Sequence, residues 1–285
     1  MYTVTGVTGK VGAVVAQELL KSGETVRAVV RDPHKGRAWA ERGCDVAVAD
    51  IEDAAALARA FTGSSGVFLM SPPNFDPEPG FPQIHQRIAA LTEAVARGAP
   101  GKVVFLSTVG AHVTEPTLLT NSNLIEQALQ ALAVPTAFLR AAWFMENSQW
   151  DIAGAREGVI SSFLQPLDHP IPMIATTDIG KVAAELLRES WSGNRVVELE
   201  ALRRYSANDI GAAFTAALKR PVEMKSVPRT DWEELFRAQG MKNPMPRIRM
   251  LDGFNEGWID FEGGAIEHRY GKMTLEAVIS KLLYR

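Results

Sequence analysis

The sequence predicts an α/β protein, in which a doubly wound parallel sheet is followed by a smaller, mostly helical C-terminal lobe. In the first half, short apolar runs rich in β-branched residues alternate with amphipathic segments. Runs that are apolar throughout are typical of parallel strands covered on both faces, and their alternation with helices favours a parallel sheet. A glycine-rich turn joins the first run to the first amphipathic segment, and the alternation stops after residue 140.

Seven segments have the strand pattern. They are residues 3–6, 25–30, 45–50, 66–71, 102–107, 135–140 and 195–200. Helices are expected between the strands, because apolar side chains recur at three- and four-residue spacing. This spacing is present at Val11, Val14, Val15 and Leu19, and again through residues 118–132.

Further helices are predicted after residue 140. They cover residues 176–190, 206–218 and 273–283. Pairs of the capping-box type mark helix starts at Ser206 with Asp209 and at Thr230 with Glu233.

The alternation of strands and helices divides the chain into two expected units. Residues 143–170 are rich in aromatic residues and prolines, and we expect them to form loops. Residues 1–142 together with 171–200 are expected to form the sheet unit. Residues 143–170 together with 201–285 are expected to form the second lobe, which would contact a substrate or a partner.

The composition is that of a globular protein, with 46% hydrophobic and 22% charged residues among 285. Thirty Lys and Arg against 33 Asp and Glu give a net charge of −3, which provides no broad basic surface for nucleic acid or an anionic membrane. No apolar stretch is long enough to span a bilayer, and Cys44 is the single cysteine. We therefore expect a cytoplasmic protein, a monomer or homodimer, without membrane or nucleic-acid partners.

The glycine-rich turn has the sequence GVTGKVG and follows the first strand. Glycines permit a tight turn and the close approach of a pyrophosphate, while the helix N-terminus supplies free amides and positive potential. The alternative is a tight turn that binds nothing. The position between a strand and an amphipathic helix favours a dinucleotide, with contacts expected from Gly6, Thr8, Gly9, Lys10, Val11 and Gly12.

Cations gather where the second strand ends. An NAD-specific site usually has an acid about 20 residues after the loop, but Arg31 stands there, with Lys35 beyond it and Lys10 in the loop. A charge-assisted hydrogen bond to a 2′-phosphate contributes about 1.5–3 kcal/mol, so NADP(H) should be preferred over NAD(H) by about tenfold or more. The alternative is that these are solvated surface cations, and Asp32 leaves NAD open.

Other strand ends supply further candidate cofactor contacts, because ligands of open α/β sheets bind outside the carboxyl ends of the strands. The candidates are Asp50, Ile51, Met70, Ser71, Pro72, Ser107 and Thr108. Asp50 could accept a hydrogen bond from adenine, or it could instead start the cap of the following helix.

Seven motifs, spread over nearly the whole chain, together resemble those of one protein family. They are TGVTGKVG, VVRDP, ADIED, VVFLSTVGA, LIEQALQALAVPTAFLRAAWFMEN, TTDIGKVAAELL and RYSANDIGAAFTAALKRPV. With them the sequence resembles the NmrA-like branch of the atypical short-chain dehydrogenases. The resemblance implies an NAD(P)-binding, Rossmann-like fold in the sheet unit and a small C-terminal lobe. Members of that family include NADPH-dependent quinone or azo-compound reductases and redox-sensing regulators without established turnover.

The dyad typical of short-chain dehydrogenases is missing. Those enzymes usually protonate a carbonyl with a Tyr that is tuned by a Lys four residues later. This sequence has no Tyr-x-x-x-Lys, and the corresponding helix offers Asn121, Ser122, Asn123 and Glu126. Ketone reduction makes an alkoxide that needs a proton donor, whereas quinone reduction makes a phenolate whose conjugate acid has a pKa of about 10. The sequence therefore favours quinones or no catalysis, and it identifies no catalytic residue.

The candidate substrate pocket is Trp143, Phe144, Asn147 and Trp150, which Phe163 could join. Flat aromatic walls and one amide suit a small planar conjugated acceptor. The alternative is that these aromatics belong to the core. No histidine pattern typical of a metal site is present, so no metal is expected.

Two functions follow from these residues. The first is NADPH-dependent reduction of quinones or related conjugated acceptors by hydride transfer. The second is a non-catalytic NADP(H)-binding redox sensor that acts on a protein partner. Residues 74–82, which follow the fourth strand, are expected to form either a lid or an ordered proline turn.

Overall fold

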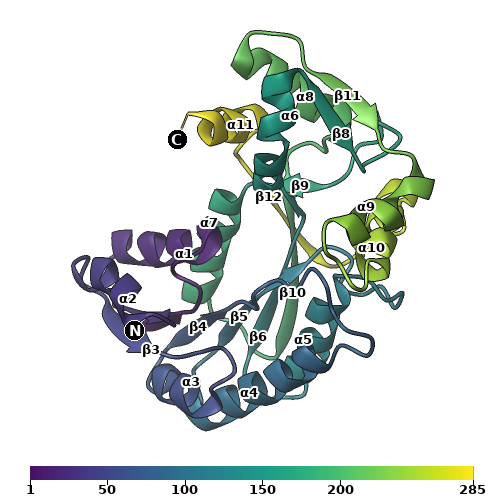
Figure 1. Cartoon of the computed structure of the whole chain (residues 1–285). Coiled ribbons are helices and arrows are strands. Elements are labelled where there is room, and N and C mark those ends of the chain that lie inside the picture. Colours follow the sequence, from purple (N-terminus) through teal and green to yellow (C-terminus); the bar gives the residue numbers. More distant parts are fainter. Residues whose placement is uncertain (285) are drawn as a thin grey trace.

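The computed structural model describes residues 1–284, and within them eight strands form one parallel sheet (Figure 1). The strands are β1 (Tyr2–Val4), β2 (Val26–Val30), β3 (Asp45–Val48), β4 (Gly66–Leu69), β5 (Val103–Thr108), β6 (Thr136–Ala141), β10 (Asn194–Ala201) and β12 (Glu267–Gly271). Their order across the sheet is β12-β10-β6-β5-β4-β1-β2-β3. All seven predicted strands are confirmed, with ends that differ by one or two residues.

Helices cover both faces of the sheet. The helices of this unit are α1 (Lys10–Lys21), α2 (Pro33–Ala40), α3 (Ala54–Phe61), α4 (Pro82–Gly98), α5 (Thr120–Gln130) and α7 (Thr176–Arg188). Apolar side chains of α1 and α7 share one core cluster with Val4 and Leu139. Those of α3, α4 and α5 form another cluster with Val67 and Phe105. The doubly wound architecture is therefore confirmed.

The strand order places a crevice next to the glycine loop. The chain builds outward from β1 to β2 and β3, and then crosses back so that β4 pairs with the other side of β1. Where the direction of winding reverses, the connections leave the carboxyl edge of the sheet in opposite directions and do not cover it. The loop that follows β1 opens into this gap.

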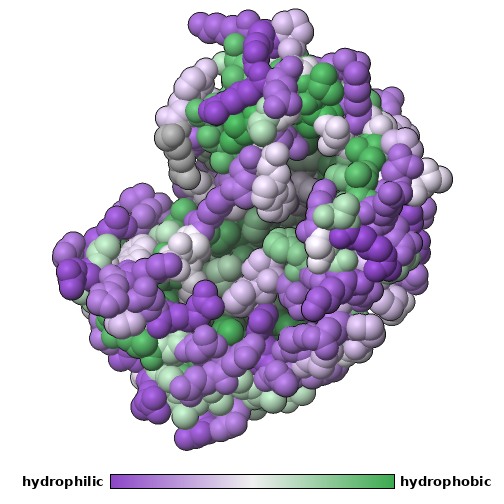
Figure 2. All heavy atoms as spheres, in the orientation of Figure 1, coloured by the Kyte–Doolittle hydropathy of each residue, from purple (hydrophilic) through white to green (hydrophobic). Residues whose placement is uncertain are grey.

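The second lobe is mostly helical and has its own core. Its elements are β7 (Trp143–Phe144), the 3₁₀ segment η1 (Met145–Asp151), α6 (Ile152–Glu157), β8 (Val159–Ser162), β9 (Met173–Ile174), α8 (Ala207–Leu218), β11 (Glu223–Ser226), the 3₁₀ turn η2 (Arg229–Asp231), α9 (Trp232–Ala238), α10 (Met245–Glu256) and α11 (Leu275–Leu283). Trp232, Phe214 and Phe236 are fully buried in this core. Figure 2 shows a deep hollow between the lobe and the sheet, with apolar residues inside it and a largely hydrophilic rim.

The prediction of loops over residues 143–170 was wrong for 143–162, which contain β7, η1, α6 and β8, and is confirmed for 163–170. Each element is short, and α6 has only six residues, so none spans enough turns to show a helical period. The strand β8 does alternate exposed and buried residues, and it pairs with the distant β11.

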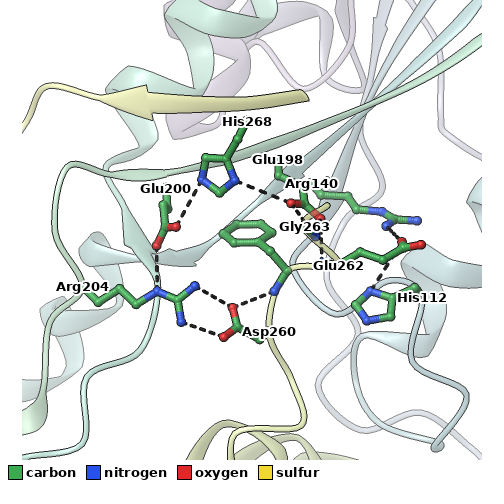
Figure 3. Close-up of polar contacts among 10 residues, drawn as sticks. His112, Arg140, Glu198, Glu200, Arg204, Asp260, Glu262, Gly263 and His268 are labelled. Atoms are coloured by element: carbon green, nitrogen blue, oxygen red, sulfur yellow. Dashed lines mark hydrogen bonds and ion pairs between the residues drawn. The ribbon is translucent and has the colours of Figure 1, made fainter. Parts of the chain in front are cut away.

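The edge strand β12 was missed. Its sequence, EHRYG, lacks the apolar run of the other strands, and polar contacts hold it instead. Arg195 Nη2 lies 2.6 Å from Glu267 Oε2 across the β10–β12 pair. His268 lies between two carboxylates of β10, with Nδ1 3.6 Å from Glu198 and Nε2 3.1 Å from Glu200 (Figure 3). Although β12 lies in the segment assigned to the second lobe, it extends the main sheet. Conversely, β9 lies in the segment assigned to the sheet unit but pairs with β7. The division into two units stays a prediction.

The two expected capping boxes differ in outcome. Ser206 and Asp209 cap α8 reciprocally, with the Asp209 amide 3.2 Å from the Ser206 hydroxyl and the Ser206 amide 2.8 Å from the Asp209 carboxylate. The box at Thr230 and Glu233 was wrong. The turn η2 delays the start of α9 until after Asp231, whose carboxylate accepts from the Thr230 hydroxyl at 2.9 Å.

None of the helices in the part of the chain that the structure describes has both the length and the apolar character needed to cross a bilayer.

Candidate functional site

The glycine loop lies directly after β1 and leads into α1. Gly6 has φ of +66°, a conformation that side chains rarely adopt, and the Gly9 amide donates to its carbonyl at 2.9 Å. A Cβ at Gly12 would collide with the Gly6 carbonyl oxygen and lie 2.8 Å from that of Thr5. The helix α1 can therefore pack this closely against the loop only because residue 12 is a glycine. Because Gly9 caps α1 without a side-chain acceptor, the first amides of the helix are available to an anion.

A cleft of about 250 Å³ opens at this loop, along the carboxyl ends of β1, β2, β3 and β4. Seven predicted cofactor residues line it, namely Gly6, Thr8, Gly9, Arg31, Ile51, Met70 and Pro72. Val30, Ala49 and Leu57 add an apolar wall that the sequence did not identify. The cleft thus joins an apolar slot, suited to a flat base, to a polar end suited to phosphates.

The three cations expected at the 2′-phosphate are not placed together. Arg31 is exposed and lines the cleft, while the neighbouring Asp32 caps α2 by accepting from the backbone at 2.9 Å. Lys35 is exposed in the first turn of α2, outside the residues that line the cleft. Lys10 Nζ donates to Gln149 Oε1 at 2.7 Å and so reaches the second lobe. Of the three cations, Arg31 is the one among the residues that line this cleft, and a cofactor role for all three stays a prediction.

The other predicted contacts at β3 and β4 lie beside the cleft. Asp50 Oδ1 accepts from the Glu52 amide at 3.0 Å, and Asp53, not Asp50, caps α3. Ser71 Oγ accepts from Arg87 Nη1 at 2.7 Å, which orients its hydroxyl. Val11 and Gly12 are buried in α1. A cofactor role for these residues stays a prediction.

Ser107 and Thr108 end β5, and Ser107 belongs to a buried polar cluster. Its hydroxyl donates to Glu126 of α5, which also accepts from Arg140 Nε at 3.1 Å and Nη2 at 2.8 Å. Arg140 Nη1 donates to Glu262 at 2.6 Å (Figure 3). Burial acts to lower the pKa of Arg140, but the hydrogen bonds and charges of Glu126 and Glu262 outweigh it and raise that pKa. The carboxylate of Glu126, which α5 presents here, is therefore already paired with the guanidinium of Arg140.

The aromatic segment has a mixed environment. Trp143 packs edge-on against Phe254 of α10, with 5.2 Å between ring centroids, and Phe144 packs against a core cluster. Asn147 is half-buried in η1, whereas Trp150 is 62% exposed. Trp143 and Phe144 thus contribute to packing, whereas most of Trp150 is accessible to solvent. A substrate role for the four stays a prediction.

Residues 74–82, which we call the strap, connect the two lobes. The exposed ring of Phe75 meets Trp150 edge-on, with centroids 6.3 Å apart. The Asp76 carboxylate accepts from the amides of residues 242–243 at 2.9 and 2.7 Å, and these bonds lower the pKa of Asp76. The sequence expectation of a lid or an ordered turn did not include this contact, because its two sides are more than 160 residues apart.

A second cleft of about 330 Å³ lies where the starts of α1 and α7 face α11. Its residues include Lys10, Glu146, Thr176 and Lys281. The Glu146 carboxylate accepts from the Thr176 amide and, at 2.6 Å, from its hydroxyl, so it caps α7 from the second lobe. Glu146 could not be identified from the sequence, since an isolated Glu gives no local signal.

Asp151 is a half-buried carboxyl at the end of η1, immediately after Trp150. It occupies the N-cap position of α6 without accepting a capping hydrogen bond. Burial raises the pKa of Asp151 to about 7. The end of η1 therefore carries a carboxyl whose pKa is raised by burial, and nothing in the sequence marked it.

Comparisons with known proteins identify the family and the fold of the chain. Residues 2–257 match the NmrA-like family. The chain is 27% identical over 261 residues to an NAD(P)H azoreductase of Xenophilus azovorans, covering 90% of this chain and 85% of that protein. It is 26% identical over 247 residues to quinone oxidoreductase 2 of Escherichia coli, covering 85% and 82%. Among solved structures, Citrobacter sp. triphenylmethane reductase complexed with NADP(H) superposes with a TM-score of 0.83 at 19% identity, covering 99% of this chain and 100% of that chain.

Proposed function

The chain belongs to the NmrA-like family, and from that premise we propose that it is a reductase that uses NADPH to reduce quinones or related conjugated acceptors. The observation that carries this proposal is the cleft at the glycine loop, where Arg31 lies at the end of β2. The relatives named as NAD(P)H azoreductase and quinone oxidoreductase 2 support the same reaction class.

The residues of the cleft fit a pyridine dinucleotide. The open amides at the start of α1 would bind the pyrophosphate, and the space that Gly12 keeps free of a Cβ lets the loop lie against the helix. Ile51, Ala49 and Leu57 would cover the adenine, and Arg31 would bind the 2′-phosphate. Bound NADPH would supply the hydride, while the protein supplies binding and orientation.

The residues around α5 favour substrates whose reduction needs no proton-donating side chain. The sequence lacks the Tyr and Lys of the usual dyad, and the buried carboxylate of Glu126 is occupied by Arg140 and Ser107. A quinone yields a phenolate, which takes its proton from water, since its conjugate acid has a pKa of about 10. A ketone yields a far more basic alkoxide and should react poorly.

The test is oxidation of NADPH, followed at 340 nm, with a panel of benzoquinones and naphthoquinones and a matched panel of ketones. We expect turnover with quinones and none above background with ketones. A protein that binds NADPH but oxidises it with no quinone would refute the catalytic proposal.

A second candidate is the redox sensor, and one contact favours it. Lys10 of the glycine loop donates to Gln149 of η1, so a ligand that draws Lys10 away would release a contact between the lobes. The sensor requires the oxidised and reduced cofactor to bind two arrangements unequally. Limited proteolysis of the strap, saturated with NADP⁺ or with NADPH, would then give different cleavage rates. Equal rates would count against the sensor.

A further inference from the structure

Arg87 of α4 joins two loops that border the cleft at the glycine loop. Its Nη1 donates to Ser71 Oγ at 2.7 Å and to the Pro72 carbonyl at 2.9 Å, both in the loop that follows β4. Its Nη2 lies 3.6 Å from Glu52 Oε1, in the loop that follows β3. We call these three contacts the Arg87 bridge.

Both loops supply residues that line the cleft. Ile51, which precedes Glu52, comes from the loop after β3, and Pro72 and Pro73 come from the loop after β4. In the sheet, β1 and β2 lie between β3 and β4, so strand pairing does not join these two loops directly. The Arg87 bridge spans this gap and thereby holds Ile51 and the two prolines at a set separation.

A second arginine of the same helix shows what is unusual about Arg87. Arg97 has a 58% exposed side chain and pairs with Glu93 one turn away at 2.7 Å, which is an ordinary surface contact within one helix. The side chain of Arg87 is 13% exposed, and its partners lie in two other parts of the chain. Arg87 thus connects separate elements, whereas Arg97 does not contribute such a connection through this pair.

The helix that carries Arg87 is packed on the same core as the cleft. Ile84 and Leu91 of α4 belong to one buried cluster with Ala49 and Leu57, and the last two also line the cleft. The base of Arg87 and one wall of the cleft therefore belong to the same packed layer. From this layer the guanidinium extends to the two loops.

Loops that are held in place before a ligand arrives improve its binding. A flat ring that enters a slot with fixed walls does not have to order those walls, and so it avoids that loss of conformational entropy. The hydrogen bonds of Arg87 have a charged donor, which makes them stronger than bonds between neutral groups. In the proposed function, Ile51 would cover the adenine, which NADPH and NADH have in common. The Arg87 bridge would therefore affect both dinucleotides alike.

We propose that Arg87 is a positioning residue for the adenosine end of the cofactor: by joining the loops after β3 and β4, it keeps Ile51 and Pro72 at the spacing that the adenine requires. The inference rests on the proposed function in one respect, that a pyridine dinucleotide binds in this cleft. Arg87 acts through the two loops and takes no part in the hydride step.

The test measures binding and is independent of turnover. The full-length protein is titrated by calorimetry with NADPH, with NADH and with adenosine 2′,5′-bisphosphate, a fragment that keeps the adenosine end and lacks the nicotinamide. Arg87→Met keeps an apolar stem and removes the guanidinium. We expect it to weaken the binding of all three ligands by a similar factor of about tenfold. The ratio of the NADPH and NADH affinities should stay unchanged, in contrast to the effect expected for Arg31→Ala.

Further variants separate this role from a merely structural one. Arg87→Lys keeps the charge but not the planar fork, so its loss of affinity should be smaller. Ser71→Ala removes one acceptor of the bridge; it should weaken NADPH binding in the wild-type protein and add no further loss to Arg87→Met. The matched control is Arg97→Met on the same helix, which should leave all three affinities unchanged. A merely structural role for Arg87 would lower Tm and leave the affinities measured well below Tm unchanged.

Two results would overturn the inference: an Arg87→Met variant with unchanged affinities, or a loss for the dinucleotides that the adenosine fragment does not share. If Arg87→Met does not fold, Arg87→Lys and Ser71→Ala still decide. A wild-type protein that binds none of the three ligands would overturn both the inference and the proposed function. A protein that shows the expected losses but oxidises NADPH with no quinone would retain the role of Arg87 and refute the proposed reductase.

Discussion

The buried pair of Glu126 and Arg140 provides the sharpest test of the packing beneath the candidate site. Their side chains are 4% and 7% exposed, and two hydrogen bonds of 3.1 and 2.8 Å join them. Glu126→Leu would leave the Arg140 guanidinium with Glu262, whose side chain is 48% exposed, and would remove the acceptor of the Ser107 hydroxyl.

Breaking a buried ion pair from one side costs about 3–5 kcal/mol. We expect about 3 kcal/mol for Glu126→Leu, because Glu262 still neutralises part of the charge on Arg140. For a protein of this size, such a loss lowers Tm by about 6–10 °C. The double variant Glu126→Leu/Arg140→Met replaces both charges with apolar groups and should recover at least half of the loss.

The assay is urea unfolding at pH 7, followed by circular dichroism. The control is Glu93→Leu, which removes one partner of the exposed Arg97–Glu93 pair and should change the free energy of unfolding by less than about 0.5 kcal/mol. The reasoning would be refuted if Glu126→Leu lowered the free energy of unfolding by less than about 1 kcal/mol. It would also be refuted if the double variant lost as much free energy of unfolding as the two single variants added together.

Three further predictions follow from the same structure. Arg31→Ala should weaken NADPH binding about tenfold and NADH binding less than twofold, and fluorescence titrations that gave equal losses would exclude a phosphate contact. Gly12→Ala should cost about 1–3 kcal/mol in urea unfolding and abolish cofactor binding, since the new methyl group meets the Gly6 carbonyl; an unchanged variant would contradict the packing of α1. Asp151 has a folded pKa of about 7 against an ordinary value of 3.8, so its effect on stability becomes less favourable as pH rises from about 4 to 7. Asp151→Asn should therefore stabilise the protein at pH 8 by up to about 4 kcal/mol and change little at pH 4, and equal effects at both pH values would show that the carboxyl is not desolvated.

The sheet and its glycine loop could be predicted because their signals are local. Apolar β-branched runs mark β1 to β6 and β10, and the glycine spacing marks the turn where winding reverses. The edge strand β12 carries no such run, since ion pairs and His268 hold it. Short elements such as α6 fall below the length at which a period can be recognised.

The candidate site was predictable only where it follows strand ends. Arg31 and Ile51 lie in the cleft because each stands just beyond a strand. Lys10 was expected at a phosphate but reaches Gln149, and this contact joins residues 139 positions apart. Glu126 was noted in the sequence, but its pairing with Arg140 depends on how α5 packs on the sheet. Such pairings have no local pattern, which is why the sequence could not provide them.

We have proposed that the cleft beside the glycine loop binds NADPH through Arg31. Calorimetric titration of the wild-type protein with NADPH and with NADH is the decisive measurement. We expect one site per chain, with NADPH bound about tenfold tighter or more than NADH. Absence of binding to either dinucleotide, or equal affinity for both, would contradict it.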